Sequence, residues 1–289
     1  MKIDSPEKLA LWQKECQKKQ EQYKKKVIIC FGPGCLACGC RDVYDRFEKE
    51  LDELNVKDFS LEAVKKTGCH GLCEKGPLVV IEPEGTFYTK VKPAHVRDII
   101  EKTLQKGELV EKLLYTDPKT EKRIEDYKEI PFYKKQMRLA LRNLGHIDPD
   151  SIEDYVATGG YSAVTKVLTE MTPQEVIDEV KLSHIRGRGG GGFPAGRKWE
   201  TCRKVESDTH YVICNGDEGD PGAFMDRSIM EGDPHAVLEG MIVCAYAVGA
   251  KDAYIYVREE YPLAVMHLYQ AIDDAEKHGL LGDNIMGTD

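Results

Sequence analysis

The spacing of the cysteines constrains this fold more than any other feature of the sequence. Six of the ten cysteines lie within the 44 residues from Cys30 to Cys73, and they include a C-x4-C pair and a C-x3-C pair. Four thiolates brought together from two loops are the ligand set of a [2Fe–2S] cluster, with two sulfurs for each iron. The residues predicted to hold such a cluster are Cys30, Cys35, Cys69 and Cys73.

Other uses of these cysteines stay open. Cys30, Cys35 and Cys38 also fit a C-x4-C-x2-C spacing with a distant fourth ligand, but that scheme leaves out either Cys69 or Cys73. Four cysteines suffice for zinc, although zinc pairs are more often C-x2-C, and the chain would then be a non-catalytic interaction module. A thiol oxidoreductase that uses Cys35 and Cys38 is a third interpretation, although the usual aromatic-Cys-Gly-Pro setting is lacking.

Length and charge exclude several classes of protein. The chain has 289 residues, enough for about two domains, and a formal net charge of −9, which disfavours a nucleic-acid partner. No apolar run approaches the ~20 residues of a membrane-spanning helix, and the N-terminus lacks the apolar core of a secretory signal. We therefore expect a cytoplasmic protein, in which clustered cysteines bind metal or do redox chemistry.

The apolar patterns predict an α/β chain whose first domain, residues 27–105, is thioredoxin-like and carries the [2Fe–2S] site. A β-α-β-β-β-α order is typical of such a small layered fold. The N-terminal residues 1–26 are expected to form a helix, and the charged residues 106–150 a connector with local helix near 132–143. The elements expected in the first domain are strands at 27–31, 59–64, 78–82 and 86–91 and helices at 41–54 and 93–104.

A second α/β domain is predicted over residues 151–289. Thr172-Pro173-Gln174-Glu175 has the N-cap, first-turn proline and N3 glutamate of a capped helix. Alternation of strands and helices beyond it indicates parallel α/β units. The expected elements are strands at 211–215 and 253–257 and helices that begin at 233 and 262.

A glycine-rich run follows the capped helix. It satisfies G-x-G-x-x-G, but a helix rather than a strand precedes it, so the usual dinucleotide fingerprint does not apply. The run still offers backbone amides to a flat ring or a pyrophosphate, with basic side chains and an aromatic ring nearby, although a purely structural loop is the alternative. The candidate cofactor-binding residues are Gly187, Arg188, Gly189, Gly190, Gly191, Gly192, Phe193 and Lys198.

An acidic loop, CNGDEGDPGAF, directly follows the strand predicted at 211–215. Ligands of α/β domains lie at the carboxyl ends of strands. Amide and carboxylate groups suit ribose hydroxyls and the N–H edge of a flavin, whereas a solvated acidic turn is the alternative. The candidates here are Asn215, Asp217, Glu218 and Asp220.

Three motifs, GRGGGGFPAGRKW, CNGDEGDPGAF and EGDPHAVLEGM, carry a resemblance to a known family. The chain resembles the flavin- and NADH-binding subunit of respiratory complex I and its soluble relatives. It is most similar to the β subunit of electron-bifurcating [FeFe] hydrogenases and to NAD(P)-linked hydrogenase or formate dehydrogenase subunits. In those relatives a thioredoxin-like [2Fe–2S] domain precedes the flavoprotein domain, and CFGPGC and GCHGLCEKGP resemble it.

The resemblance implies roles for the candidate residues. FMN would contact Gly187, Gly189, Lys198, Asn215, Asp217 and Glu218, and NADH would face Gly190, Gly191, Phe193 and Asp220. The implied function is an electron-transfer subunit that oxidises NADH, or reduces NAD⁺, through FMN and passes single electrons to iron–sulfur clusters. The implied partners are other subunits of a hydrogenase or formate dehydrogenase complex, NADH and ferredoxin, with no nucleic acid and no membrane span. The acidic loop favours NAD over NADP because it would repel a 2′-phosphate.

Three parts of the family pattern are absent from the sequence: a second flavin-binding segment, a β-grasp region and a C-terminal [4Fe–4S] cysteine domain. We therefore expect that the flavoprotein domain at 151–289 is incomplete and that [4Fe–4S] clusters belong to the missing part. The 289-residue chain alone is expected to keep its [2Fe–2S] module, to bind FMN weakly or not at all and to lack NADH–ferricyanide activity.

Overall fold

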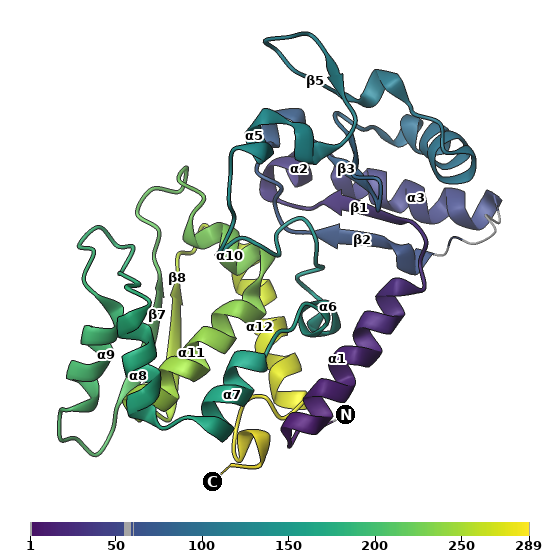
Figure 1. Ribbon diagram of the computed structural model, residues 1–289. Coiled ribbons are helices and arrows are strands. Elements are labelled where there is room, and N and C mark those ends of the chain that lie inside the picture. The colour runs from purple at the N-terminus through teal and green to yellow at the C-terminus, as the bar shows by residue number, and fades with distance from the viewer. Residues whose placement is uncertain (1, 55–58, 60, 289) are drawn as a thin grey trace. The chain divides into compact units, whose positions relative to one another are not determined.

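Two compact units make up the chain in the computed structural model, which describes residues 2–54, 59 and 61–288 (Figure 1). The cysteine unit comprises Gln17–Asp154 and Glu231–Asp233. The loop unit comprises Met1–Cys16, Tyr155–Met230 and Pro234–Asp289. Helix α1 (Pro6–Glu21) contributes residues to both. The cysteine unit is therefore inserted in the sequence between two parts of the loop unit.

The cysteine unit contains a four-stranded sheet in the order β2-β1-β3-β4, with β1 and β2 parallel and the other pairs antiparallel. Val27 in β1 lies opposite Val64 on one side and Ile81 on the other. The strand expected at 59–64 begins later, since a 3-10 turn occupies Leu61–Ala63, and residue 60 lies outside the described part. The strands are β1 (Lys26–Cys30), β2 (Val64–Thr67), β3 (Val79–Glu82) and β4 (Thr86–Tyr88).

Helices of the cysteine unit cover this sheet as the apolar spacing predicts. In α3 the side chains of Val43, Phe47 and Leu51 recur every four residues, and all three are buried in one core with the strands. Towards the end of the predicted domain, a 3-10 turn leads into α4, which continues as a π-helical segment to Leu104. The helices are α2 (Pro33–Ala37), α3 (Cys40–Leu54) and α4 (Val96–Asp98).

The segment 106–150 is not the loose connector that the sequence suggested. Val110, Leu113 and Ile130 are buried in the same core as the sheet, and the amide of Val110 donates to the hydroxyl of Tyr88 at 3.1 Å. Only α5 (Pro131–Lys134) forms where a longer helix was expected near 132–143. The expectation failed because these apolar residues insert singly between turns, without the period of a helix or strand. Two short strands, β5 (Tyr115–Thr116) and β6 (Arg123–Ile124), complete the segment.

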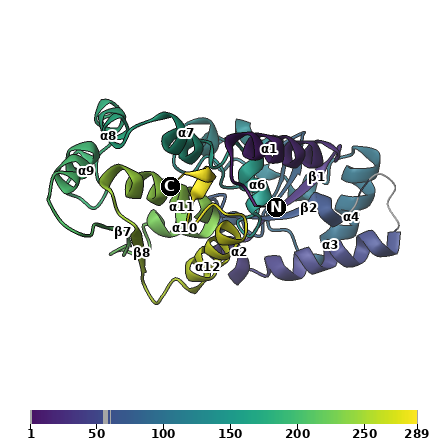
Figure 2. The same ribbon diagram turned by 90° about the horizontal axis from the view of Figure 1, so that it is seen from below.

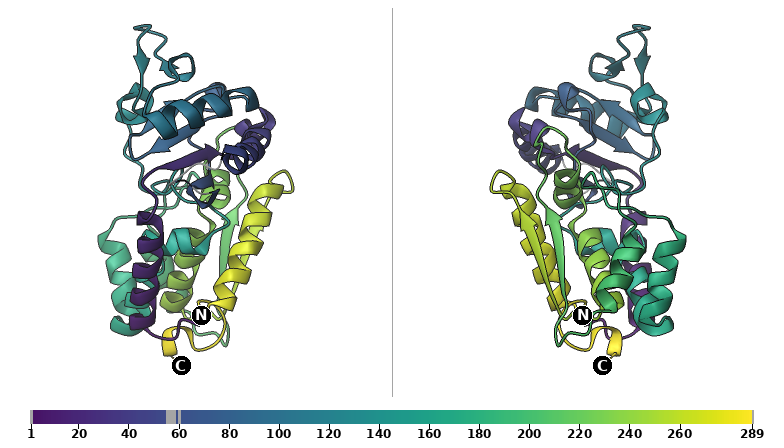
Figure 3. Two further views of the ribbon diagram at one scale, coloured as in Figure 1. Left: turned by 90° about the vertical axis from the view of Figure 1, so that its right-hand side faces the viewer. Right: turned by 90° about the vertical axis from the view of Figure 1, so that its left-hand side faces the viewer.

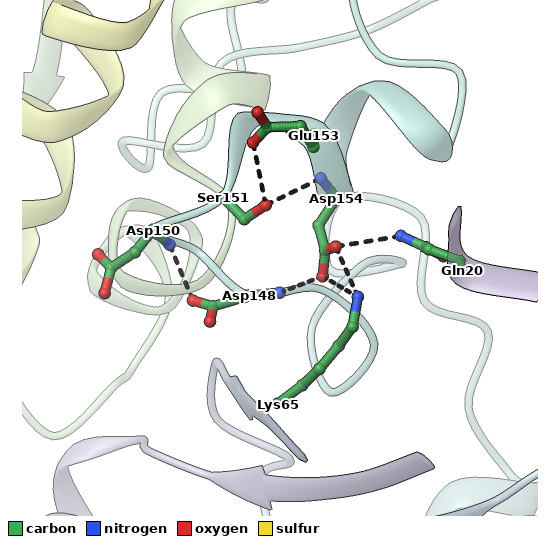
Figure 4. Close-up of polar contacts among 7 residues, drawn as sticks. All are labelled: Gln20, Lys65, Asp148, Asp150, Ser151, Glu153 and Asp154. Carbon is green, nitrogen blue, oxygen red and sulfur yellow. Dashed lines mark hydrogen bonds and ion pairs between the residues drawn. The ribbon is translucent and has the colours of Figure 1, made fainter. Parts of the chain in front are cut away.

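A carboxylate network fixes the end of this segment to the sheet (Figure 4). Asp154 pairs with Lys65 of β2 at 2.6 Å and accepts hydrogen bonds from Gln20 and from the amide of Asp148. The Asp148 carboxyl accepts from the amide of Asp150 at 3.0 Å. Burial raises the pKa of Asp148 to about 6, although that amide and the charge of a nearby lysine oppose the shift.

The loop unit is built on two parallel strands, β7 (Tyr211–Gly216) and β8 (Asp252–Val257), which run side by side (Figures 1 and 3). Helix α11 contacts both strands and packs against α7, α8, α9 and α12. Figure 2 shows α8 and α9 on one side of α11 and α12 on the other. The helices are α6 (Ile152–Ala157), α7 (Ser162–Glu170), α8 (Pro173–Leu182), α9 (Ala195–Arg203), α10 (Asp226–Gly232), α11 (Pro234–Val248) and α12 (Pro262–Lys277).

Two local patterns decide where the helices of the loop unit begin. The capping box expected at Thr172 is present at α8, where the Glu175 carboxylate accepts from the amide of Thr172 at 2.7 Å. Helix α7 has no side-chain cap of its own, and Glu239 of α11 replaces it by accepting from the amides of Ala163 and Val164. The buried glutamate also accepts from the hydroxyl of Tyr155, so α11 positions the start of α7.

The first residues of the chain pack on the last helix of the loop unit. The amide of Ile3 donates to the carbonyl of His278 at 2.7 Å, and the ring of Trp12 stacks on His278 with centroids 4.6 Å apart. Trp12 belongs to the narrow apolar face of α1. The N-terminal helix is therefore part of the packing of the loop unit.

We expect Asp148→Asn to stabilise the protein at high pH only. Because the pKa of Asp148 is raised in the folded state, its ionisation lowers the free energy of unfolding as the pH rises from about 4 to 6. The free energy of unfolding stays lower above pH 6. At pH 8 the variant should unfold with a free energy about 1–2 kcal/mol larger than the parent chain, and at pH 4 the two should match. Urea titrations at both pH values measure this; Asp52→Asn, at an exposed position of α3, is the control. Equal gains at pH 4 and pH 8 would contradict the assignment.

Candidate functional site

Two loops of the cysteine unit bring four thiols together. Cys30 is the last residue of β1 and Cys35 lies in α2, while Cys69 and Cys73 lie in the loop after β2. The sulfurs of Cys69 and Cys73 are 3.6 Å apart, and Cys30 is near enough to Cys35 and Cys69 for both side chains to act on the pKa of its thiol. Parallel pairing of β1 with β2 places the ends of both strands at one edge, which explains why residues so far apart in sequence meet.

Glycines provide the space in which these thiols converge. A Cβ atom at Gly32 would lie 2.6 Å from the Cβ of Cys69, and one at Gly76 would lie 2.8 Å from the sulfur of Cys35. Gly34 approaches Cys73 in the same way, at 2.9 Å. Each distance is shorter than any real Cβ contact, so any larger residue would displace a cysteine. The glycines of CFGPGC and EKGP are thus a steric requirement of the site.

The electrostatics of the thiols suit a bound cationic centre. The neighbouring Cys35 side chain and burial raise the pKa of Cys30 to about 12, and the Cys30 side chain and burial raise that of Cys69 to about 11. These two thiols resist ionisation unless a cation compensates the charge, and iron or zinc deprotonates its thiol ligands outright. The amide of Gly71 donates to the sulfur of Cys69 at 3.3 Å, a contact that favours the thiolate.

The two remaining cysteines of the cluster lie apart from this set. Cys38 is exposed beyond the end of α2, and Cys40 is buried in the core as the first residue of α3. Within the described part of the chain, no three His, Cys, Asp or Glu side chains are arranged to hold one metal ion. A two-iron cluster does not require such a group, because each iron takes only two protein sulfurs. The four cysteines therefore fit a [2Fe–2S] cluster, and their role as ligands stays a prediction.

The glycine run forms an exposed loop between α8 and α9. The amide of Gly187 donates to the carbonyl of Phe193 at 2.9 Å, which closes the loop at its base. Gly190 and Gly192 have positive φ angles of 98° and 58°, and a Cβ at Gly189, Gly190, Gly191 or Gly192 would meet nothing within 4 Å. The loop thus presents open backbone to a ligand, as the sequence predicted.

Basic and aromatic side chains surround this loop. Arg188 and Lys198 are exposed, and the guanidinium of Arg197 lies 5.7 Å from the centre of the exposed Phe193 ring. Such a surface can accept a phosphate and a flat ring. It fits FMN in its chemistry, since open amides and cations match the phosphate and the ring.

The acidic loop follows β7 and contains one carboxylate with a structural task. Glu218 is buried and accepts from the amides of Met225 and Arg227 at 2.7 and 2.9 Å, so it holds the loop in shape. By contrast, Asp217 and Asp220 are exposed. Asn215 is exposed as well, and its side-chain oxygen accepts from the amide of Asp217 at 2.9 Å.

Arg258 is a residue of this site that the sequence motifs did not indicate. It directly follows β8, and its guanidinium donates to the carbonyl of Glu218 at 2.7 Å and lies 3.6 Å from the Asp217 carboxylate. Parallel strands end at one edge of a sheet, so the residue after β8 could have been expected to reach the loop after β7. The position of Arg258 directly after β8 was therefore the sequence signal that could have identified it.

The two loops extend from the end of the loop unit at which β7 and β8 terminate (Figure 1). None of the hydrogen bonds among the described residues joins one loop to the other. An open apolar groove of about 1110 Å³ lies elsewhere in the unit, lined by residues such as Leu238, Tyr254 and Leu268, and no predicted cofactor residue lines it. None of the described helices combines the length and the apolar character needed to cross a membrane.

Comparisons with known families match both units. Residues 16–104 match the thioredoxin-like [2Fe–2S] ferredoxin family, and residues 180–286 match the Nuo51 FMN-binding domain family. A thioredoxin-like [2Fe–2S] ferredoxin from Aquifex aeolicus is 30% identical and aligns over 35% of this chain and 97% of its own, with a TM-score of 0.28. The α/β organisation expected from the sequence, with the ferredoxin-like domain first, is thus confirmed.

Curated relatives align with about half of this chain. The NADP-reducing hydrogenase subunit HndC of Solidesulfovibrio fructosivorans is 56% identical over 155 residues, which are 54% of this chain and 31% of the relative. An NADH-quinone oxidoreductase subunit of Rhizobium meliloti (strain 1021) is 49% identical over 148 residues, which are 51% of this chain and 35% of the relative. The chain spans about a third of the length of the curated relatives it matches.

We expect Cys73→Ser to abolish native cluster assembly and Cys38→Ser to leave the cluster intact. Cys73 lies within the converged set, whereas Cys38 is exposed outside it. Iron content and the EPR signal of the reduced protein measure the outcome. Loss of the signal on changing Cys38 alone would favour the C-x4-C-x2-C scheme instead.

Proposed function

We propose that this chain, whose residues 16–104 and 180–286 match the thioredoxin-like [2Fe–2S] ferredoxin family and the Nuo51 FMN-binding domain family, is a flavin- and NADH-binding subunit of the complex I type. As such a subunit it would transfer electrons between NADH and iron–sulfur clusters. It would oxidise NADH, or reduce NAD⁺, at FMN held by the loop unit. Single electrons would pass to a [2Fe–2S] cluster held by Cys30, Cys35, Cys69 and Cys73.

One observation carries the proposal: the four thiols of the cysteine unit converge in a chain whose other unit presents an open glycine loop. The sulfurs of Cys69 and Cys73 lie 3.6 Å apart, and Cys30 links this pair to Cys35. A zinc module would not need the open backbone of Gly189–Gly192. A dithiol enzyme would need Cys35 and Cys38 paired, whereas Cys35 is buried beside Cys30 and Cys38 is exposed.

The residues of the loop unit would bind and orient the cofactors. Bound FMN supplies the exchange between two-electron and one-electron chemistry. Arg188 and Lys198 offer positive charge to a phosphate and to the negative charge of a reduced ring. On the FMN side we place Gly187, Gly189, Lys198, Asn215 and Asp217, with Glu218 acting through the loop that it shapes. On the NADH side we place Gly190, Gly191, Phe193 and Asp220.

The exposed carboxylates would also select the nucleotide. Asp217 and Asp220 bring negative charge to the strand ends where a ribose would lie, and this disfavours a 2′-phosphate. NAD is therefore the proposed nucleotide. We further propose that the chain works in the cytoplasm as a subunit of a hydrogenase or formate dehydrogenase assembly, with ferredoxin as a further electron-transfer partner.

Anaerobic purification of the chain, followed by visible spectroscopy and assays for metal and acid-labile sulfide, tests the cluster. Iron with sulfide and visible absorbance bands supports the proposal. Colourless protein with bound zinc would establish the interaction module, and metal-free protein with an oxidisable dithiol would establish the thiol oxidoreductase.

In a subunit with a complete flavoprotein domain, we expect Asp220→Ala to weaken NADH binding about tenfold while FMN binding changes little. One carboxylate oxygen of Asp220 accepts from the amide of Gly222 at 2.9 Å, and the other would accept a ribose hydroxyl worth about 1.4 kcal/mol. Titration of NADH in the presence of excess FMN, and of FMN alone by flavin fluorescence, measures both. Asp208→Ala, an exposed site before β7, is the control. Loss of FMN binding with unchanged NADH affinity would reverse the assignment.

A further inference from the structure

The segment 106–150 lies outside both matched domains, yet part of it packs against the thiol site. His70, the neighbour of Cys69, is buried among aromatic rings. The ring centroids of Phe87, Tyr127 and Tyr133 lie 6.1, 6.4 and 6.5 Å from that of His70, all near edge-to-face. Two of these three rings come from the segment 106–150.

A second contact fixes the loop between Cys69 and Cys73. The guanidinium of Arg138 donates to the carbonyl of His70 at 2.8 Å and lies 5.3 Å from the centre of the Tyr133 ring. A Cβ at Gly71 would be only 3.3 Å from that guanidinium. The segment therefore reaches the ligand loop itself, through Arg138 and through the Tyr133 ring that packs on His70.

The hydroxyl of Tyr133 has no acceptor in the described part of the chain, although its oxygen is buried. A buried O–H without a partner costs about 1–3 kcal/mol, and most such groups in native proteins are satisfied. Apart from burial and Arg138, the groups that act electrostatically on this hydroxyl are Cys30, Cys69 and Cys35, whose thiolate charge would raise the pKa of Tyr133. The unpartnered O–H therefore belongs to a ring that packs on His70, the neighbour of Cys69, within the electrostatic range of three of the four proposed ligands.

We propose that Tyr133 donates a hydrogen bond to a sulfur of the iron–sulfur cluster, and that the segment 106–150 thereby sets the cluster's reduction potential. The proposal rests on the cluster assigned under the proposed function. A donor to sulfur stabilises the negative charge that the cluster gains on reduction, so it raises the potential. Tyr133 would touch the cofactor directly, from a part of the chain beyond the ferredoxin domain.

Tyr127 supplies a matched control. It belongs to the same aromatic cluster, but the carboxylates of Glu82 and Asp126, and none of the thiols, are the charges that raise the pKa of its hydroxyl. Tyr127→Phe and Tyr133→Phe each remove one hydroxyl and keep the ring. Only the second removes a donor to sulfur.

The test is an EPR-monitored redox titration of the full chain loaded with its cluster. We expect Tyr133→Phe to make reduction about tenfold less favourable, a shift of about 59 mV to lower potential for one electron, at unchanged cluster content. Tyr127→Phe should leave the midpoint unchanged. An unchanged or higher midpoint in Tyr133→Phe, or an equal shift in both variants, would overturn the proposal.

A second measurement identifies the acceptor. The resonance Raman Fe–S bands of the parent protein should shift in D₂O, and part of that shift should disappear in Tyr133→Phe. The Nε2 of His70 is also buried without a partner, and if it accepted the bond instead, the Tyr133-dependent part of the shift would be absent and the proposal would fail. If Tyr133→Phe assembled no cluster, the Raman spectrum of the parent protein would test the proposal by itself. Fe–S bands that do not shift in D₂O would overturn it. A parent protein without any cluster refutes the proposed function itself, which is a distinguishable result.

Discussion

Convergence of four thiols at the edge of a small sheet is the interaction on which the cysteine unit depends. The thiols approach so closely that glycine is required opposite three of them, at Gly32, Gly34 and Gly76. The parallel pairing of β1 with β2 delivers both ligand loops to one edge, and the core beneath fixes the strands that carry them. Without a metal, this cluster is electrostatically unfavourable, because Cys35 and burial raise the pKa of Cys30, and Cys30 and burial raise that of Cys69. The site therefore needs all three features together: the glycines that leave room for the thiols, the parallel pairing that brings the loops to one edge, and the charge of a bound metal centre.

A comparable constraint operates in the loop unit, where polar rather than sulfur contacts shape the site. Both oxygens of the Glu218 carboxylate accept hydrogen bonds from backbone amides, and a hydrogen bond from Arg258 links the loop after β7 to the end of β8. Buried charge-assisted bonds of this kind hold a loop in one conformation. The glycine loop, in contrast, has few internal contacts and open backbone. A ligand would thus contact the acidic loop, whose shape is fixed by these hydrogen bonds, and the glycine loop, whose backbone can adjust.

Elements with a strong local signal were predictable from the sequence. The capping box at Thr172, the parallel strands β7 and β8 and the amphipathic helix α3 all have a period or a cap that local chemistry dictates. The cysteine pairs likewise indicated which thiols would meet. Interactions without local pattern were missed, because they depend on the tertiary fold. Val110 and Ile130 enter the core singly, Arg258 reaches the acidic loop through sheet topology, and Tyr133 packs on His70 of the ligand loop from a segment that looked like a connector.

The discontinuous sequence of the loop unit has a consequence for biosynthesis. Its first piece, which includes Ile3 and Trp12, packs on His278, a residue that is translated some 270 residues later. At typical elongation rates the two are separated by roughly 10–60 s. The whole cysteine unit except Glu231–Asp233 emerges from the ribosome during this interval. Metal insertion into the nascent chain can therefore precede closure of the loop unit, and the apolar face of α1 is left for a chaperone to protect until the last helix is made.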